Sequence, residues 1–124
     1  CVANANRQRL TDAIAAHVAW TSRLKTAIDR GSLEMPVETI KADNRCQFGK
    51  WLYGIELSAA DKASTDYRSV RQLHADFHAA AAGVAELAVT GRTQAAAGAM
   101  AASSEYARTS SALKTAIEKW IAAI

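Results

Sequence analysis

The chain has 124 residues, half of them apolar, and a formal net charge of +3 from 15 basic and 12 acidic residues. This length suits one domain with its own core, and the scattered charges lack the basic footprint of a nucleic-acid-binding protein. No apolar run approaches the roughly 20 residues that a membrane-spanning helix needs. We therefore expect a single domain over residues 1–124, with no nucleic-acid partner and no direct insertion into a membrane.

The composition predicts an all-α protein. Alanine, the best helix former, dominates the apolar residues, and Pro36 is the only proline. The first helix is expected from about Asn4 to Asp29, with Gly31 as its stop signal. Apolar residues recur on it at spacings of three and four, which is typical of the inward face of a bundle helix. The members of this stripe are Leu10, Ile14, His17, Thr21, Leu24 and Ile28.

Two short helical segments are expected next. Val37–Lys41 forms one turn, and a second short helix covers Arg45–Tyr53, capped by Asp43 or Asn44. Cys46 lies in the first turn of this second helix. Its apolar side chains are too large for a solvated loop, so they should pack between the longer helices. They are Phe48, Trp51 and Leu52.

A long helix follows and ends at Gly91. Its start is predicted at Ser58-Ala-Ala-Asp61, which has the form of a capping box, with Ser64 as a weaker alternative. His74 lies on its inward stripe, and His78 projects from the same side one turn later. The stripe consists of Tyr67, Val70, His74, Phe77, Ala81, Val84 and Ala88.

The last helix is predicted from Thr93 to the end of the chain. The first half of its inward stripe is small and the second half bulky, which fits either close packing inside one bundle or a helix shared with a second copy. Together the segments predict an all-α four-helix bundle with an additional short helix that carries the cysteine. The stripe consists of Ala96, Ala99, Ser103, Tyr106, Ser110, Leu113, Ile117, Trp120 and Ile124.

The histidines and one cysteine are candidate metal ligands. Two histidines four residues apart on a helix can bind one metal ion, and His74 and His78 have this spacing. His17 lies on the inward stripe of another helix, and Cys46 opens the short aromatic helix. Nitrogen and sulfur ligands suit Zn²⁺, but by spacing alone the histidines are equally explained as packed core residues. We expect Cys46 to be reduced rather than paired with Cys1, in a cytoplasmic protein.

Three segments in order resemble one known family. His17-Val-Ala-Trp20, Cys46-Gln-Phe-Gly-Lys-Trp-Leu-Tyr53 and His74-Ala-Asp-Phe-His78 are similar to the pattern of the chemoreceptor zinc-binding (CZB) domain. The resemblance implies a four-helix bundle with a zinc site made of His17, Cys46, His74 and His78. It also implies a homodimer and a regulatory role, because such domains are joined to bacterial chemotaxis receptors or diguanylate cyclases.

A zinc site with four protein ligands has no open position for a substrate, so we expect a non-enzymatic protein. Asp76, between the two histidines, should point to the opposite face and is a poor general base. We therefore predict a zinc-binding regulatory domain, a fragment of a larger signalling protein, whose zinc occupancy or Cys46 oxidation modulates a covalently linked output domain. The alternative is a structural zinc-stapled dimerisation bundle with no sensing role.

Overall fold

The computed structural model describes residues 2–32, 36–42, 46–101 and 104–123. These residues form seven α-helices and no strand, which confirms the predicted all-α class. In chain order the helices are α1 (Val2–Arg30), α2 (Val37–Lys41), α3 (Gln47–Leu52), α4 (Ala59–Ala63), α5 (Thr65–Val89), α6 (Thr93–Ala99) and α7 (Glu105–Ala123).

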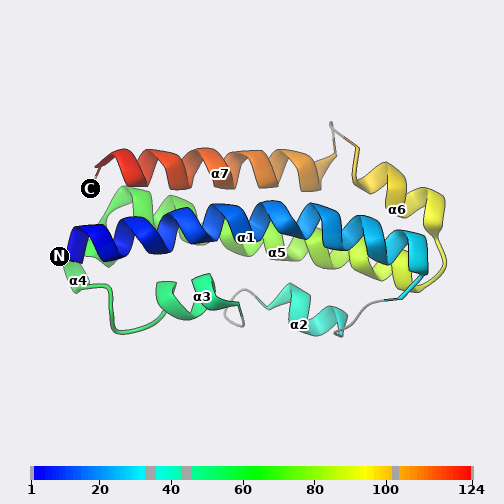
Figure 1. Ribbon diagram of the computed structural model, residues 1–124, viewed down its shortest axis with the longest axis horizontal. Helices are drawn as coiled ribbons and strands as arrows, with labels where there is room; N and C mark the ends of the chain where they lie inside the picture. The colour runs from blue at the N-terminus through cyan, green and yellow to red at the C-terminus, as the bar shows by residue number, and fades with distance from the viewer. Residues whose placement is uncertain (1, 33–35, 43–45, 102–103, 124) are drawn as a thin grey trace.

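The three long helices α1, α5 and α7 lie side by side along the long axis of the molecule (Figure 1), and each packs against the other two. Helices α1 and α5 run in one direction and α7 runs back. The chain returns from the end of α1 to the start of α5 through α2 and then α3. These two short helices therefore occupy the position that the second helix has in an up-down-up-down four-helix bundle. Helix α3 corresponds to the short helix that the sequence predicts at the cysteine.

Glycines end two of the long helices, as predicted. Gly31, after α1, has φ +70°, and Gly91, after α5, has φ +80°. Glycine adopts this left-handed conformation without a steric penalty from Cβ. The first helix is slightly longer than the range from Asn4 to Asp29 that its periodicity indicates.

Ser64 sets the start of α5. The predicted capping box between Ser58 and Asp61 does form, but it caps only the five residues of α4. The Ser64 hydroxyl donates to the Asp61 carbonyl at 2.8 Å and accepts from the Tyr67 amide at 3.1 Å. One side chain thus ends α4 and begins α5, so the predicted start at Ser58 is wrong for the long helix and the alternative at Ser64 is right.

The single last helix predicted from Thr93 is also wrong, because α6 and α7 are separate. Helix α6 lies across the end of the bundle, where Ala96 packs against Ala27 and Ala88. Helix α7 instead runs back along α1 and α5. Ala96 therefore packs closely within the bundle, whereas the other small residues of α6 are exposed or half-buried.

Helix α3 is shorter than predicted by one or two residues at each end. Cys46 is its N-cap rather than part of its first turn, and the Cys46 sulfur accepts a hydrogen bond from the Gly49 amide at 3.3 Å. The remaining predictions on Cys1, the caps Asp43 and Asn44, and the stripe positions Ser103 and Ile124 lie outside the described residues.

The inward stripes meet in one core. Every predicted inward position of α5 is buried, and Leu10 and Leu24 of α1 are fully enclosed. Trp51 of α3 reaches α7, where its ring lies 5.7 Å from that of Trp120. Among the described residues, the buried polar side chains of this core are the three histidines. In the same part of the chain, no helix is both long enough and apolar enough to cross a membrane.

Candidate metal centre

His17 points inward from the middle of α1 and is 6% exposed. Its Nδ1 lies 2.6 Å from the carbonyl oxygen of Ala13, one turn earlier. A carbonyl can only accept a hydrogen bond, so Nδ1 carries the proton and Nε2 has a free lone pair. The local helix geometry thus fixes His17 in the tautomer that binds a metal through Nε2.

His74 and His78 lie one turn apart on α5 and are 0% and 2% exposed. The Nδ1 of His78 lies 2.7 Å from the carbonyl oxygen of Ile40 in α2. By the same argument His78 donates from Nδ1 and presents the Nε2 lone pair to its neighbours. Hydrogen bonds of this kind orient histidine ligands in metal sites. Helix α2 therefore takes part in the site through its backbone.

Cys46 approaches from the N-terminus of α3. The amide of Gly49 points at its sulfur, and the positive end of a helix favours the thiolate, which is the form that binds metals. Cys46 is partly exposed, unlike the three histidines. It therefore forms the edge of the cluster nearest to solvent.

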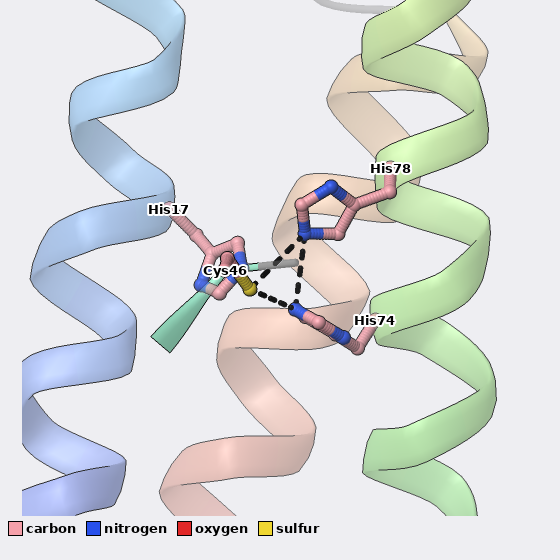
Figure 2. A group of neighbouring side chains, drawn as sticks. All are labelled: His17, Cys46, His74 and His78. Atoms are coloured by element: carbon pink, nitrogen blue, oxygen red, sulfur yellow. Dashed lines mark hydrogen bonds between the residues drawn. The ribbon is translucent and has the colours of Figure 1, made fainter. Parts of the chain in front are cut away.

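The four side chains converge from α1, α3 and α5 (Figure 2). The Cys46 sulfur lies 3.3 Å from His74 Nε2 and 3.5 Å from His78 Nε2, and the two nitrogens are 3.1 Å apart. Zinc–nitrogen bonds of about 2.05 Å and zinc–sulfur bonds of about 2.3 Å in a tetrahedron give edges of roughly 3.3 Å and 3.6 Å. Three of the ligand atoms are thus already spaced for one zinc ion.

His17 completes the group less tightly. One ligand atom from each of the four residues lies within 4.8 Å of the other three. This upper limit exceeds the tetrahedral edges by roughly 1.2 to 1.5 Å, a movement that a side-chain adjustment can supply. The arrangement therefore fits a closed site with three nitrogen ligands and one sulfur ligand.

Burial keeps His17 and His74 neutral. It lowers the pKa of His17 to about 4, against the opposing hydrogen bond to Ala13 and with a smaller contribution from His78. Burial, together with the nearby imidazoles of His78 and His17, lowers the pKa of His74 to about 2. At pH 7 both rings are therefore unprotonated, as metal binding requires.

Aromatic rings enclose the cluster. Phe77 meets His17 edge to face at 5.0 Å between ring centroids, and Phe48 meets His74 at 5.1 Å. The Nδ1 atom of His74 is buried and has no hydrogen-bond partner among the described residues. This apolar shell excludes water from the histidines and strengthens electrostatic interactions inside it.

Residues 17–85 match the family described as the chemoreceptor zinc-binding domain, CZB. The match covers more than half of the chain and includes all four clustered residues. The chain belongs to the CZB family. Comparison with curated proteins and with solved structures gave no match.

Membership of the CZB family makes zinc the cofactor of this domain, and the cluster of three histidines and one cysteine is placed to bind such an ion. The structure brings together all four residues that the sequence indicates. Asp76 is exposed and accepts a hydrogen bond from Gln72 at 3.0 Å. It thus lies away from the cluster, as the helical spacing predicts.

Two hydrogen-bond partners of the clustered histidines were missed by sequence reasoning, and both are backbone carbonyl oxygens. The Ala13 carbonyl is four residues before His17, so helix geometry alone could have indicated it. The Ile40 carbonyl depends on how α2 folds back onto α5 and has no sequence signal. Thr21, one turn after His17 on the inward stripe of α1, is hydrogen-bonded to the hydroxyl of Tyr106 at 3.1 Å and not to the cluster.

Proposed function

We propose that this domain is a zinc-binding regulatory module in which His17, Cys46, His74 and His78 hold one Zn²⁺ ion. The observation that carries the proposal is the convergence of four ligand atoms within 4.8 Å, with two of the histidines presenting Nε2 lone pairs. Zinc occupancy, or oxidation of Cys46, would modulate an output domain in the same polypeptide. The output domain belongs to a bacterial chemotaxis receptor or a diguanylate cyclase.

The donor set supports a regulatory site rather than a catalytic one. Catalytic zinc sites usually have three protein ligands and one open position for water or substrate, whereas four protein side chains converge here. The nearest carboxylate in sequence, Asp76, is exposed on the other face of α5. A thiolate ligand also fits a reducing compartment such as the cytoplasm.

A chain of contacts supports a route from the site to α7. Cys46 caps α3, and Trp51 on the same short helix packs against Trp120 near the end of α7. The carbonyl of Leu52, at the end of α3, accepts a hydrogen bond from Tyr67 at 2.8 Å. A displacement of α3 after loss of the Cys46 bond would therefore change the packing around Trp120.

Removal of single ligands tests the proposal. We expect Cys46→Ala and His74→Ala to lower zinc affinity by more than about 100-fold, since even the loss of a group that only orients a ligand costs roughly 10- to 100-fold. Gln47→Ala and Gln72→Ala are matched controls, because both glutamines are exposed neighbours on the same helices. Zinc content and output of the full-length protein are measured together. Unchanged zinc affinity and unchanged output in Cys46→Ala would refute the proposal.

The alternative is a permanent structural zinc that stabilises the bundle of a homodimer. The deep burial of the three histidines favours it, since enclosed zinc sites are commonly structural. Titration at controlled free zinc separates the two functions: reversible loss in a physiological range supports regulation, and retention against strong chelators supports the structural role. Sedimentation of zinc-loaded and zinc-free protein tests the proposed homodimer.

A further inference from the structure

A groove of about 600 Å³ opens between α1, α2 and α3 and reaches the metal centre. Its walls include His17, Cys46 and His78, whereas His74 is not among its lining residues. The three histidines are at most 6% exposed, while Cys46 is partly exposed. The groove therefore leads from solvent to the cysteine side of the cluster.

The size of the groove exceeds what a hydrated ion needs. Its volume is roughly twenty times the ~30 Å³ that one water molecule occupies in the liquid, so an organic molecule with several donor atoms fits. Arg9 and Glu56 form an ion pair at 3.2 Å at one side, and the Arg23 guanidinium lies 4.0 Å from the ring centroid of Trp20. With Asp12 also lining the groove, charges of both signs surround its mouth.

The charge of the proposed zinc site favours an anionic molecule as the occupant of the groove. Three neutral imidazoles and one thiolate leave a net charge of about +1 on a zinc site of this composition. Among the described residues, the cluster includes no carboxylate to balance that charge. In an enclosed apolar setting an uncompensated charge attracts an opposite one strongly.

We propose that this groove is a binding site for a small anionic chelating molecule, with thiolate or carboxylate donors, through which zinc is exchanged. The inference rests on the proposed zinc ligands. A donor atom of the chelating molecule forms a bond to zinc as the bond between zinc and the Cys46 sulfur breaks. The released thiolate takes up a proton from water. Cys46 is displaced first because, of the three cluster residues that border the groove, it is the partly exposed one, and His74 is displaced last because it does not border the groove. No electrons are transferred.

Substitutions on α1 can close the groove without touching a ligand. Ala16 and Ala19 are exposed residues that line it, so Ala16→Trp and Ala19→Trp should fill it. Val18 is 53% exposed on the same helix but lines a separate cavity of about 290 Å³ between α1 and α7. Val18→Trp is therefore the matched control for adding a large side chain beside His17.

The experiment follows zinc loss from the loaded protein at increasing EDTA concentrations, with free EDTA and with the same chelating group attached to a large dextran. Circular dichroism and zinc content confirm that each variant is folded and loaded. We expect the rate to rise with free EDTA in the wild type and Val18→Trp, to fall several-fold in Ala16→Trp and Ala19→Trp, and to be slower with the dextran conjugate.

Three results would contradict the proposed role of the groove in zinc exchange. They are a rate independent of EDTA concentration, equal rates in all variants, and equal slowing by Val18→Trp. These results leave zinc stoichiometry and the ligand assignment intact. Failure of the proposed function looks different, because Cys46→Ala would then retain its zinc affinity.

Discussion

The two ring nitrogens of each clustered histidine have different roles. In His17 and His78, Nδ1 donates to a backbone carbonyl and Nε2 faces the cluster. In His74 the buried Nδ1 has no partner among the described residues. An unpartnered polar atom in the core costs roughly 1–3 kcal/mol. His74 therefore occupies its position at a cost to stability, which metal binding through Nε2 would offset under the proposed ligand assignment.

The neutral histidines make the zinc-free domain sensitive to acid. An unfolded histidine titrates near pH 6.5, whereas the pKa of His17 is about 4 and that of His74 about 2 in the folded state. Between these values the unfolded chain binds more protons, so stability falls as pH drops below 6.5. For His17 alone we expect a loss of about 2 kcal/mol between pH 7 and pH 5.

Urea unfolding of zinc-free protein at the two pH values measures this loss. His17→Gln is the comparison, since it removes one of the two titrating groups and should reduce the pH dependence. A transition midpoint that stays constant from pH 7 to pH 5 would contradict the predicted burial of neutral imidazoles.

At the scale of the helices, Ser64 and Ser58 provide a direct comparison of two caps. Ser64 begins the 25-residue α5, whereas Ser58 begins only the five exposed or half-buried residues of α4. Loss of an N-cap costs about 1 kcal/mol. We expect Ser64→Ala to lower the unfolding free energy by about that amount and Ser58→Ala by clearly less, measured by urea denaturation. Equal losses would mean that α4 and α5 behave as one helix.

The hydroxyl of Tyr67, on α5, holds the end of α3 through a hydrogen bond. Tyr67→Phe removes its hydrogen bond to the Leu52 carbonyl and should cost about 1 kcal/mol. The control is Tyr106→Phe, because that hydroxyl bonds the Thr21 side chain instead. We expect amide hydrogen exchange to accelerate within α3 in Tyr67→Phe only. If the two variants show the same exchange pattern, the hydrogen bond between Tyr67 and Leu52 does not hold α3 in place.

Periodicity and glycine stop signals were sufficient to predict the long helices α1 and α5 and the inward positions of their histidines. They could not separate α6 from α7, because an alanine-rich run has high helix propensity throughout and the break depends on where Ala96 packs. They also could not place Ile40 against His78, since that contact joins residues 38 positions apart through a backbone atom. The ligand types were visible in the sequence, but their convergence required tertiary structure.

At the scale of the whole molecule, the cluster joins α1, α3 and α5, which are otherwise held together by packing and by hydrogen bonds such as that from Tyr67 to the Leu52 carbonyl. A ligand that binds only the folded state stabilises it by RT ln(1 + L/Kd), where L is the free ligand concentration and Kd its dissociation constant. We expect zinc at about 100 times its dissociation constant to raise the unfolding free energy by ~2.7 kcal/mol. Thermal unfolding in zinc-buffered and EDTA-treated samples measures the gain.

Two variants test whether the gain in unfolding free energy comes from zinc bound at the cluster. One changes a cluster residue and the other changes a surface residue. His74→Ala should show no zinc-dependent stabilisation, and Gln72→Ala should behave as the wild type. If His74→Ala is stabilised by zinc as strongly as the wild type, the metal binds elsewhere on the chain.

The hydrogen bond between His78 and Ile40 restricts the length of the segment between α1 and α2. Surface connections usually tolerate insertions and deletions. Here the carbonyl of Ile40 fixes the orientation and tautomer of His78, and every amino acid at that position would supply the same atom. We therefore expect zinc binding to tolerate apolar substitutions at position 40. A change in the length of the preceding connection should instead move the carbonyl and misorient His78, although the connection itself contains no proposed ligand.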